Sequence, residues 1–306
     1  MQSSNVTSPA VPASWTVLSL LEWATGFLSA RGFDESRLNA ELLLAHVLSL
    51  RRLDLYLQFD RPLVSAELAQ FKSNLQRRLA HEPIQYITGE TEFMGIPLFV
   101  DHTVLIPRPE TEQLVERTLE TIRSMRWESP GILEIGTGSG NIAVALGHFL
   151  PGAVITSIDV SRAALDTAGR NITRNGISNV RLQQMDVFTL HPEHQRYDVI
   201  VSNPPYVPLT EFDSLQAEVR EYEPRIATTD EGDGYRLIRR IVTLARALLN
   251  PEGALLLEIG YGQSADAVRI MENNGFAPVE VFQDYAGIPR IVRGRQGTPG
   301  RRREMP

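Results

Sequence analysis

The sequence predicts an α/β fold, in which a small helical bundle and a β-hairpin connector precede a Rossmann-like sheet. Three observations predict it. Apolar residues first recur at helical spacing, then alternate in a segment rich in Gly and Pro, and finally form short Val-, Ile- and Leu-rich runs separated by helical patterns. Strands that alternate with helices in this way form a parallel sheet covered on both faces.

The first quarter of the chain reads as a helical domain over 15–85. Its apolar residues repeat every three to four positions, for example at Leu21, Ala24 and Leu28. Nothing in it resembles a catalytic constellation, so we interpret it as a substrate-recognition domain. The hairpin connector follows over 86–109, where alternating apolar residues lead into the run 104–106.

The segment 110–295 carries the sheet. Its helices are expected over 142–150, 163–171 and 235–249, and no internal repeat is visible. Its strands are expected at five apolar runs, followed by a terminal hairpin-like pair around Gly287: 132–135, 154–159, 180–185, 197–202, 254–259, then 279–282 and 288–292.

The composition of the chain excludes some kinds of functional site. The 306 residues are 42% hydrophobic and 22% charged, which is typical of a globular protein large enough for two domains. The absence of cysteine excludes disulfides, thiolate catalysis and cysteine metal sites, and no metal site is predicted. A formal net charge of -7 disfavours a protein whose main task is binding a nucleic-acid backbone, so we expect no direct nucleic-acid binding.

The ends of the chain predict no membrane association. The opening residues lack a basic region and a continuous apolar stretch, and no apolar run is long enough to cross a bilayer. We therefore expect a cytoplasmic protein with flexible tails at 1–14 and 296–306. Three arginines, 301–303, offer a basic patch as an alternative, but a solvated tail is favoured.

A glycine-rich turn follows the first predicted strand. Glycines allow a tight turn and a close approach of the backbone to a ligand, and the helix that follows adds free N–H donors. The spacing is G-x-G-x-G, whereas dinucleotide oxidoreductases use G-x-G-x-x-G in the same context. The turn therefore predicts a nucleotide-type binding site, formed by Gly136, Thr137, Gly138, Ser139 and Gly140.

Carboxylates end the next two strands. Asp159 is placed to accept hydrogen bonds from both hydroxyls of a ribose, although with Ser161 it could instead cap the following helix. Asp186 could accept from an adenine amino group, with Val187 and Phe188 packing on the ring. An ordinary loop aspartate is nearly as good an interpretation of Asp186.

The fourth strand ends in Asn203-Pro204-Pro205-Tyr206. Two prolines have no N–H, so the turn is rigid and leaves the Pro204 carbonyl without local donors. The Asn203 side-chain oxygen and the Pro204 carbonyl can hold both hydrogens of an NH2 group, while Tyr206 offers a flat face to a planar substrate. The turn therefore predicts methyl transfer to a planar amide or amino nitrogen, with a proline-rich loop after a buried strand as the alternative.

Together these motifs resemble the class I S-adenosylmethionine-dependent methyltransferases, and more closely the peptide-chain release factor glutamine N5-methyltransferases. The glycine turn and the Asn-Pro-Pro-Tyr turn carry the resemblance. Four further segments extend it along the chain: 82–89 (EPIQYITG), 105–112 (LIPRPETE), 221–224 (EYEP) and 257–260 (LEIG).

The resemblance implies S-adenosylmethionine as the cofactor and the glutamine of a Gly-Gly-Gln loop in a class 1 release factor as the substrate, in translation termination. It assigns the cofactor's methionine part to the glycine turn, its ribose to Asp159 and its adenine to Asp186 and Val187. Family members often carry an aromatic residue where this chain has Val187. Asn203, next to the cofactor, opens the turn that holds the glutamine: Asn203, Pro204, Pro205 and Tyr206. Glu134 stands where many relatives have Asp, and we expect it still to serve the cofactor.

Four rivals remain at this point. A nucleic-acid amino methyltransferase is the nearest, because an adenine amine offers the same hydrogens and planar face, but such enzymes need a basic surface and must flip the base. A methyltransferase of a ribosomal-protein glutamine is disfavoured by the stretch 107–112. The other two are a non-catalytic binding protein and a dehydrogenase.

Overall fold

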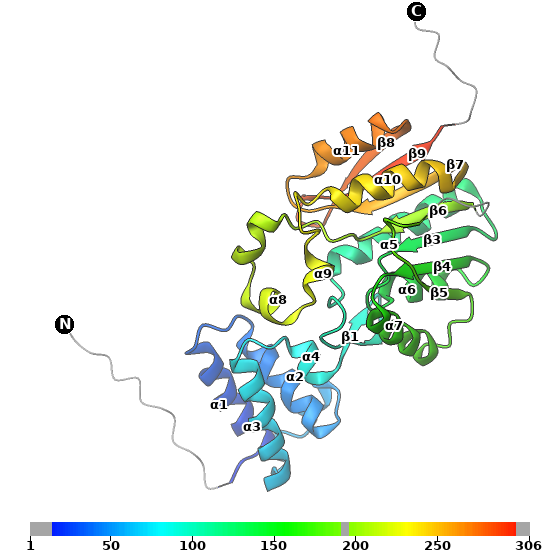
Figure 1. Cartoon of the computed structure of the whole chain (residues 1–306). Helices are drawn as coiled ribbons and strands as arrows, with labels where there is room; N and C mark the ends of the chain where they lie inside the picture. Colours follow the sequence, from blue (N-terminus) through cyan, green and yellow to red (C-terminus); the bar gives the residue numbers. More distant parts are fainter. Residues whose placement is uncertain (1–13, 191–195, 298–306) are drawn as a thin grey trace, which may run out of the picture. The chain divides into compact units, whose positions relative to one another are not determined.

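The computed structural model describes residues 14–190 and 196–297 of the chain (Figure 1). The chain divides into two compact units, Met1–Gly89 and Glu90–Pro306. Apart from Ser14, Gln296 and Gly297, the expected tails and the three arginines at 301–303 lie outside the described residues. Gln296 is buried and ends the last strand, which therefore reaches one residue into the segment expected to be a tail.

The first unit is helical, as expected. Leucine-rich faces of its helices meet in one core that includes Leu21, Leu28, Leu43 and Leu44, all fully buried. Its elements are α1 (Val17–Ser29), α2 (Ser36–Leu48), the 3-10 helix η1 (Arg52–Leu57), α3 (Ser65–Leu79) and α4 (Ile84–Thr88).

The second unit begins with the expected hairpin. Strands β1 (Glu90–Phe93) and β2 (Ile96–Phe99) pair antiparallel around Met94 and Gly95, which both have positive φ. A two-residue turn of this kind matches the twist of the flanking strands. The run 104–106, which the sequence pattern grouped with the hairpin, lies in a loop instead.

A seven-stranded sheet forms the centre of the second unit, in the order β5-β4-β3-β6-β7-β9-β8. The first five strands in this order run parallel, and β9 pairs antiparallel with both β7 and β8. The expected strands are confirmed, and β7 begins earlier than expected. Their bounds are β3 (Gly131–Ile135), β4 (Val154–Asp159), β5 (Val180–Gln184), β6 (Tyr197–Ser202), β7 (Leu249–Glu258), β8 (Phe276–Gln283) and β9 (Pro289–Gln296).

Helices cover both faces of this sheet (Figure 1). One face packs on α5 (Pro109–Met125) and α6 (Asn141–Phe149), with α7 (Arg162–Arg174) near β4 and β5. The other packs on α10 (Arg236–Leu248) and α11 (Ser264–Asn273). The strands alternate accordingly, since Ile132 and Leu133 belong to opposite cores.

Several helices were not expected from the sequence. The longest is α5, although Pro109 at its first position and Glu110 and Glu112 in its first turn are typical start signals. The others are α11, the 3-10 helix η1, α4 and the short elements η2 (Leu209–Ser214), α8 (Ala217–Tyr222) and α9 (Arg225–Thr228). Residues 86–88, which were expected to open the hairpin connector, belong to α4 instead. Within the described part of the chain, no helix has the length and apolar character that crossing a membrane requires.

The carboxyl ends of the parallel strands gather the polar motifs at one edge. The glycine turn follows β3, Asp159 ends β4, Asn203 follows β6 and Glu258 ends β7. Ligands bind at this edge in open α/β sheets.

Candidate active site

A cavity of about 630 Å³ opens at this edge of the sheet. Such a volume suits a ligand of nucleotide size. Most residues assigned to the cofactor from the sequence line it: Gly136, Thr137, Gly138, Ser139, Asp159, Asp186, Val187 and Asn203. Of the described residues assigned to the substrate turn, Asn203 and Pro205 line the cavity, whereas Pro204 and Tyr206 do not.

The glycine turn needs its glycines for two different reasons. Gly136, Gly138 and Gly140 all have positive φ. A Cβ at Gly140 would lie 3.0 Å from the Cβ of Ala168, so Gly140 lets α7 pack closely against the turn. A Cβ at Gly138 would meet nothing within 4 Å, so this residue faces open space at the cavity.

Asp159 ties the ends of β3 and β4 together. Its Oδ2 accepts from the Gly138 N–H at 2.9 Å, and its Oδ1 accepts from the Ser161 N–H at 2.8 Å. The cap of α7 is Ser161, whose Oγ accepts from the Ala164 N–H. Asp159 is therefore not the N-cap residue, and its carboxylate lies at the cavity wall with lone pairs left for further donors.

Glu134 lies beneath the glycine turn and is fully buried. Ser157 donates to its Oε2 and also contacts the Thr137 hydroxyl, while no described residue is a partner for its Oε1. Burial raises the pKa of Glu134 to about 8, and the charge of Asp159 adds to the rise.

The segment after β5 forms another part of the cavity wall. Asp186 accepts from the Phe188 N–H at 2.8 Å, and both Val187 and Phe188 line the cavity. Val187 is buried in the sheet core, whereas Phe188 is partly exposed and lies 4.5 Å from the Arg236 guanidinium. The one aromatic ring of this wall segment therefore comes from Phe188, beside the position where an aromatic residue is expected.

The Asn203–Tyr206 turn is held through side chains from distant elements. The Asn203 Nδ2 donates to the Thr111 Oγ1 at 3.0 Å, and the Thr111 hydroxyl donates to the Glu258 Oε2 at 2.7 Å. The Tyr206 hydroxyl donates to the other oxygen of Glu258, Oε1, at 3.3 Å. A single carboxylate at the end of β7 thus reaches both ends of the turn.

Burial dominates the electrostatics of this network. It raises the pKa of Glu258 to about 7, against the lowering effect of the hydrogen bonds from Thr111 and Tyr206. Burial and the nearby Glu258 charge likewise raise the pKa of the Tyr206 hydroxyl. Tyr206 therefore stays protonated and can donate at physiological pH.

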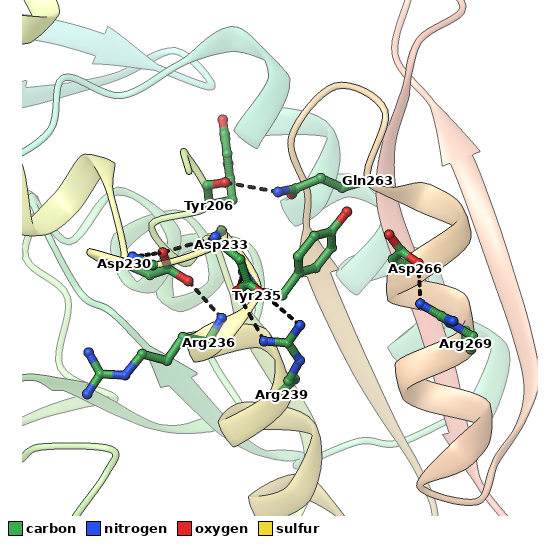
Figure 2. A network of polar contacts seen from close by, with 11 residues as sticks. Tyr206, Asp230, Asp233, Tyr235, Arg236, Arg239, Gln263, Asp266 and Arg269 are labelled. Carbon is green, nitrogen blue, oxygen red and sulfur yellow. Dashed lines mark hydrogen bonds and ion pairs between the residues drawn. The ribbon is translucent and has the colours of Figure 1, made fainter. Parts of the chain in front are cut away.

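Gln263 holds the main chain of the same turn (Figure 2). Its Nε2 donates to the Tyr206 carbonyl at 2.9 Å, and its Oε1 accepts from the Gly260 N–H at 2.8 Å. Gly234 lies so close that a Cβ there would be 2.4 Å from the Tyr206 carbonyl oxygen. Asp230 fixes that approach by accepting from the N–H groups of Gly234 and Arg236.

An ion pair joins two segments that carried the family resemblance. Arg108 lines the cavity, and its Nη2 lies 2.6 Å from the Glu223 Oε2. Glu223 also accepts from the Ile106 N–H, and its burial raises the pKa of its carboxyl. The loop over 103–108 and the segment after α8 thereby form one wall.

Sequence reasoning gave no role to Thr111, Glu258 or Gln263. The first two lie in segments that resemble the family, but their partners are far away in the chain. In residues 14–190 and 196–297, His, Asp and Glu side chains nowhere gather in threes as metal ligands would.

Comparison with known proteins agrees with this architecture. Residues 19–89 match the family model of the PrmC N-terminal domain, and residues 112–218 match that of the methyltransferase small domain. Among solved structures, the hMettl16 catalytic domain in complex with a MAT2A 3'UTR hairpin matches with a TM-score of 0.50 at 16% identity, over 65% of this chain and 75% of that one. That likeness shows the fold. The protein is a class I methyltransferase with an added helical unit.

Two curated relatives are similar over nearly their whole length. The release factor glutamine methyltransferase of Geobacter sulfurreducens is 42% identical over 286 residues, which cover 94% of this chain and 99% of the relative. That of Chlorobaculum tepidum is 43% identical over 283 residues, which cover 90% and 96%. The chain belongs to the release factor glutamine methyltransferase family.

Proposed function

We propose that this enzyme transfers a methyl group from S-adenosylmethionine to the side-chain amide nitrogen, N5, of the glutamine in the Gly-Gly-Gln motif of class 1 release factors. The observation that carries the proposal is one cavity lined by the glycine turn, by Asp159 and by Asn203. The names of the relatives support a release factor as the substrate. The residues of the site support a reaction at a planar amide beside a nucleotide-type cofactor.

The described residues fit S-adenosylmethionine. Open space at Gly138 leaves room for the methionine part beside the turn, and Asp159 keeps lone pairs for ribose hydroxyls. Asp186 and Val187 would bound the adenine, with the Phe188 ring as the aromatic surface. When bound, the cofactor supplies a methyl group on a positively charged sulfur.

The chain's own task is to orient a weak nucleophile. An amide nitrogen shares its lone pair with the carbonyl, so proximity alone gives little reactivity. Asn203 would accept one amide hydrogen through Oδ1. The carbonyl of Pro204, which stands between the cavity residues Asn203 and Pro205, would accept the other. The electron density of the amide nitrogen would then point along the line of transfer. Orientation of this kind contributes several kcal/mol. Once this nitrogen has taken up the methyl group in place of the cofactor's sulfur, its proton would become acidic and would leave to water.

The helical unit would dock the protein substrate. Its exposed apolar side chains include Leu53, Leu57 and Val64. Replacing Leu57 with Glu is expected to raise KM for the release factor by about fivefold, a typical loss for one interface residue. An unchanged KM would argue against a docking role of this face. Because the proposed substrate is a translation protein, the proposed place of action is the cytoplasm.

Transfer of labelled methyl groups tests the proposal. Purified release factor, the same factor with Gln→Ala in its Gly-Gly-Gln loop, and DNA are each incubated with the enzyme and labelled S-adenosylmethionine. We expect label on the unaltered factor alone. Label on DNA alone would keep the fold and the cofactor but overturn the substrate.

A further inference from the structure

Thr111 lies in the cavity wall and Glu258 lies behind it, and neither is among the groups that would carry the reaction. Both side chains are about 1% exposed, and Thr111 belongs to the first turn of α5 while Glu258 ends β7. Of the two, Thr111 reaches the cavity wall, and Glu258 does not. A carboxylate withdrawn in this way has no access to a substrate proton, so its contribution must pass through its neighbours.

The hydrogen bonds between these residues have a fixed direction. An ionised carboxylate only accepts, so the Thr111 hydroxyl hydrogen points at the Glu258 Oε2. Thr111 then offers a lone pair, and not a hydrogen, to the Asn203 side chain. Only the NH2 group of that carboxamide can donate a hydrogen bond to this lone pair. The observed bond from Nδ2 to Oγ1 has this direction.

The opposite end of the carboxamide is thereby left for a ligand. Asn203 lines the cavity, and no described residue donates a hydrogen bond to its Oδ1. If the amide were turned around, its NH2 would meet the NH2 of the substrate glutamine, and two donors would face each other. The orientation of one amide therefore decides whether the site accepts or repels the substrate nitrogen.

We propose that Thr111 and Glu258 are positioning residues that keep the Asn203 carboxamide oriented with its oxygen toward the substrate. The same Glu258 carboxylate also holds Tyr206 through its second oxygen. This inference rests on the proposed function, because it concerns how the glutamine amide is received. Tyr206 donates to Glu258 Oε1 while Thr111 donates to Oε2, so a shift of the carboxylate would disturb both ends of the turn together.

Two matched substitutions at Thr111 test the proposal. Thr111→Val keeps the shape but removes the hydroxyl, whereas Thr111→Ser keeps the hydroxyl and loses a methyl. We expect Thr111→Val to lower kcat by about 100-fold, as misplacement of a reacting group does, with little change in KM or in the cofactor's Kd by calorimetry. Thr111→Ser should stay close to the unaltered enzyme. Equal kcat values for the Val and Ser variants would overturn the proposal.

A second readout does not depend on turnover. The Nδ2 hydrogens of Asn203, followed by nitrogen NMR in the free protein, should exchange slowly in the unaltered enzyme and in Thr111→Ser, and fast in Thr111→Val. Slow exchange in all three would contradict this positioning role. Should Thr111→Val fail to fold, Glu258→Gln replaces it, because a glutamine can face Thr111 with either end. It is expected to lower kcat by about tenfold, and an unchanged kcat would overturn the proposal.

The two hypotheses fail in different ways. If the unaltered enzyme leaves the release factor unlabelled, the proposed function falls, yet the exchange rates still report on the Asn203 amide. If the factor is labelled and Thr111→Val labels it equally fast, the function stands and the positioning role falls.

Discussion

Two turns border the cavity, and they are held in opposite ways. The glycine turn is held mainly by neighbouring main chain, since the N–H groups of Gly136 and Thr137 both donate to the Ile158 carbonyl and the Gly140 N–H donates to that of Thr137. The Asn203–Tyr206 turn is held by side chains from α5, from β7 and from the segment before α11.

Backbone chemistry explains the difference. Glycines keep their N–H groups and reach positive φ, so a glycine turn can bond to itself and to the next strand. Pro204 and Pro205 have no N–H to donate, so hydrogen bonds with the side chains of Thr111, Glu258 and Gln263 must hold their turn in place. A rigid proline turn that presents acceptors therefore depends on residues far away in the chain. We expect the two turns to fail separately, the first in cofactor binding and the second in turnover.

The largest effect is expected for Asn203→Ala. Removing the acceptor for the substrate amide should lower the single-turnover rate by about 1,000-fold, as loss of a reacting-centre contact does. Cofactor affinity, measured by calorimetric titration, should change little. Equal loss of rate and affinity would break the division between the two turns.

Asp159→Ala should give the complementary result. Loss of charge-assisted hydrogen bonds to the ribose is expected to raise the cofactor's Kd by about 100-fold, with a smaller change of rate at saturating cofactor. Asp166→Ala is the matched control, because that aspartate is exposed and paired with Arg162 on α7. An unchanged Kd in Asp159→Ala would refute the ribose assignment.

Glu134→Gln should change how the stability of the protein depends on pH, because it replaces the buried carboxyl beneath the glycine turn with an uncharged amide. The pKa of Glu134 in the fold, about 8, lies above the ordinary 4.5, so the folded state keeps a proton that the unfolded chain releases. Stability is therefore lost as pH rises from about 4.5 to 8. Urea unfolding of the free protein at pH 9 should show the Gln variant more stable by about 5 kcal/mol, the free-energy equivalent of this pKa difference. The same pH slope in both proteins would contradict this interpretation.

A smaller effect is expected from pH on turnover. The pKa of Glu258 is about 7, and the groups facing it are Tyr206, Thr111 and Glu110, with Arg290 from β9. Below that pH the protonated carboxyl can itself donate, which removes the fixed direction of the bonds to Thr111. The rate should therefore fall by up to about tenfold as pH drops through 7, and this limb should be absent in Glu258→Gln. An identical limb in both enzymes would exclude Glu258 as its source.

The same contrast explains what the sequence could predict. The glycine turn and Asn203 follow apolar strands directly, and Asp159 ends one, so local patterns were enough to predict that they meet at one edge of the sheet. The run 104–106 was wrongly grouped with the hairpin, because an apolar triplet has the same pattern in a strand and in a cavity wall. Helix α5 was missed although its start signals are present.

The Thr111–Glu258 contact could not have been predicted from local patterns. It joins residues 147 positions apart, and it depends on how the first turn of α5 lies against the end of β7. Neither residue carries a local signal for a partner, since a threonine in a helix and a glutamate ending a strand are ordinary. The roles of the site residues stay predictions until binding and turnover are measured.

Tandem mass spectrometry of the methylated release factor tests the central claim most directly. The factor is incubated with S-adenosylmethionine and either the unaltered enzyme or Asn203→Ala, and the peptide carrying Gly-Gly-Gln is sequenced. We predict one added methyl group on the side-chain nitrogen of that glutamine with the unaltered enzyme and none with Asn203→Ala. A methyl group on another residue, or equal methylation by both enzymes, would contradict the account.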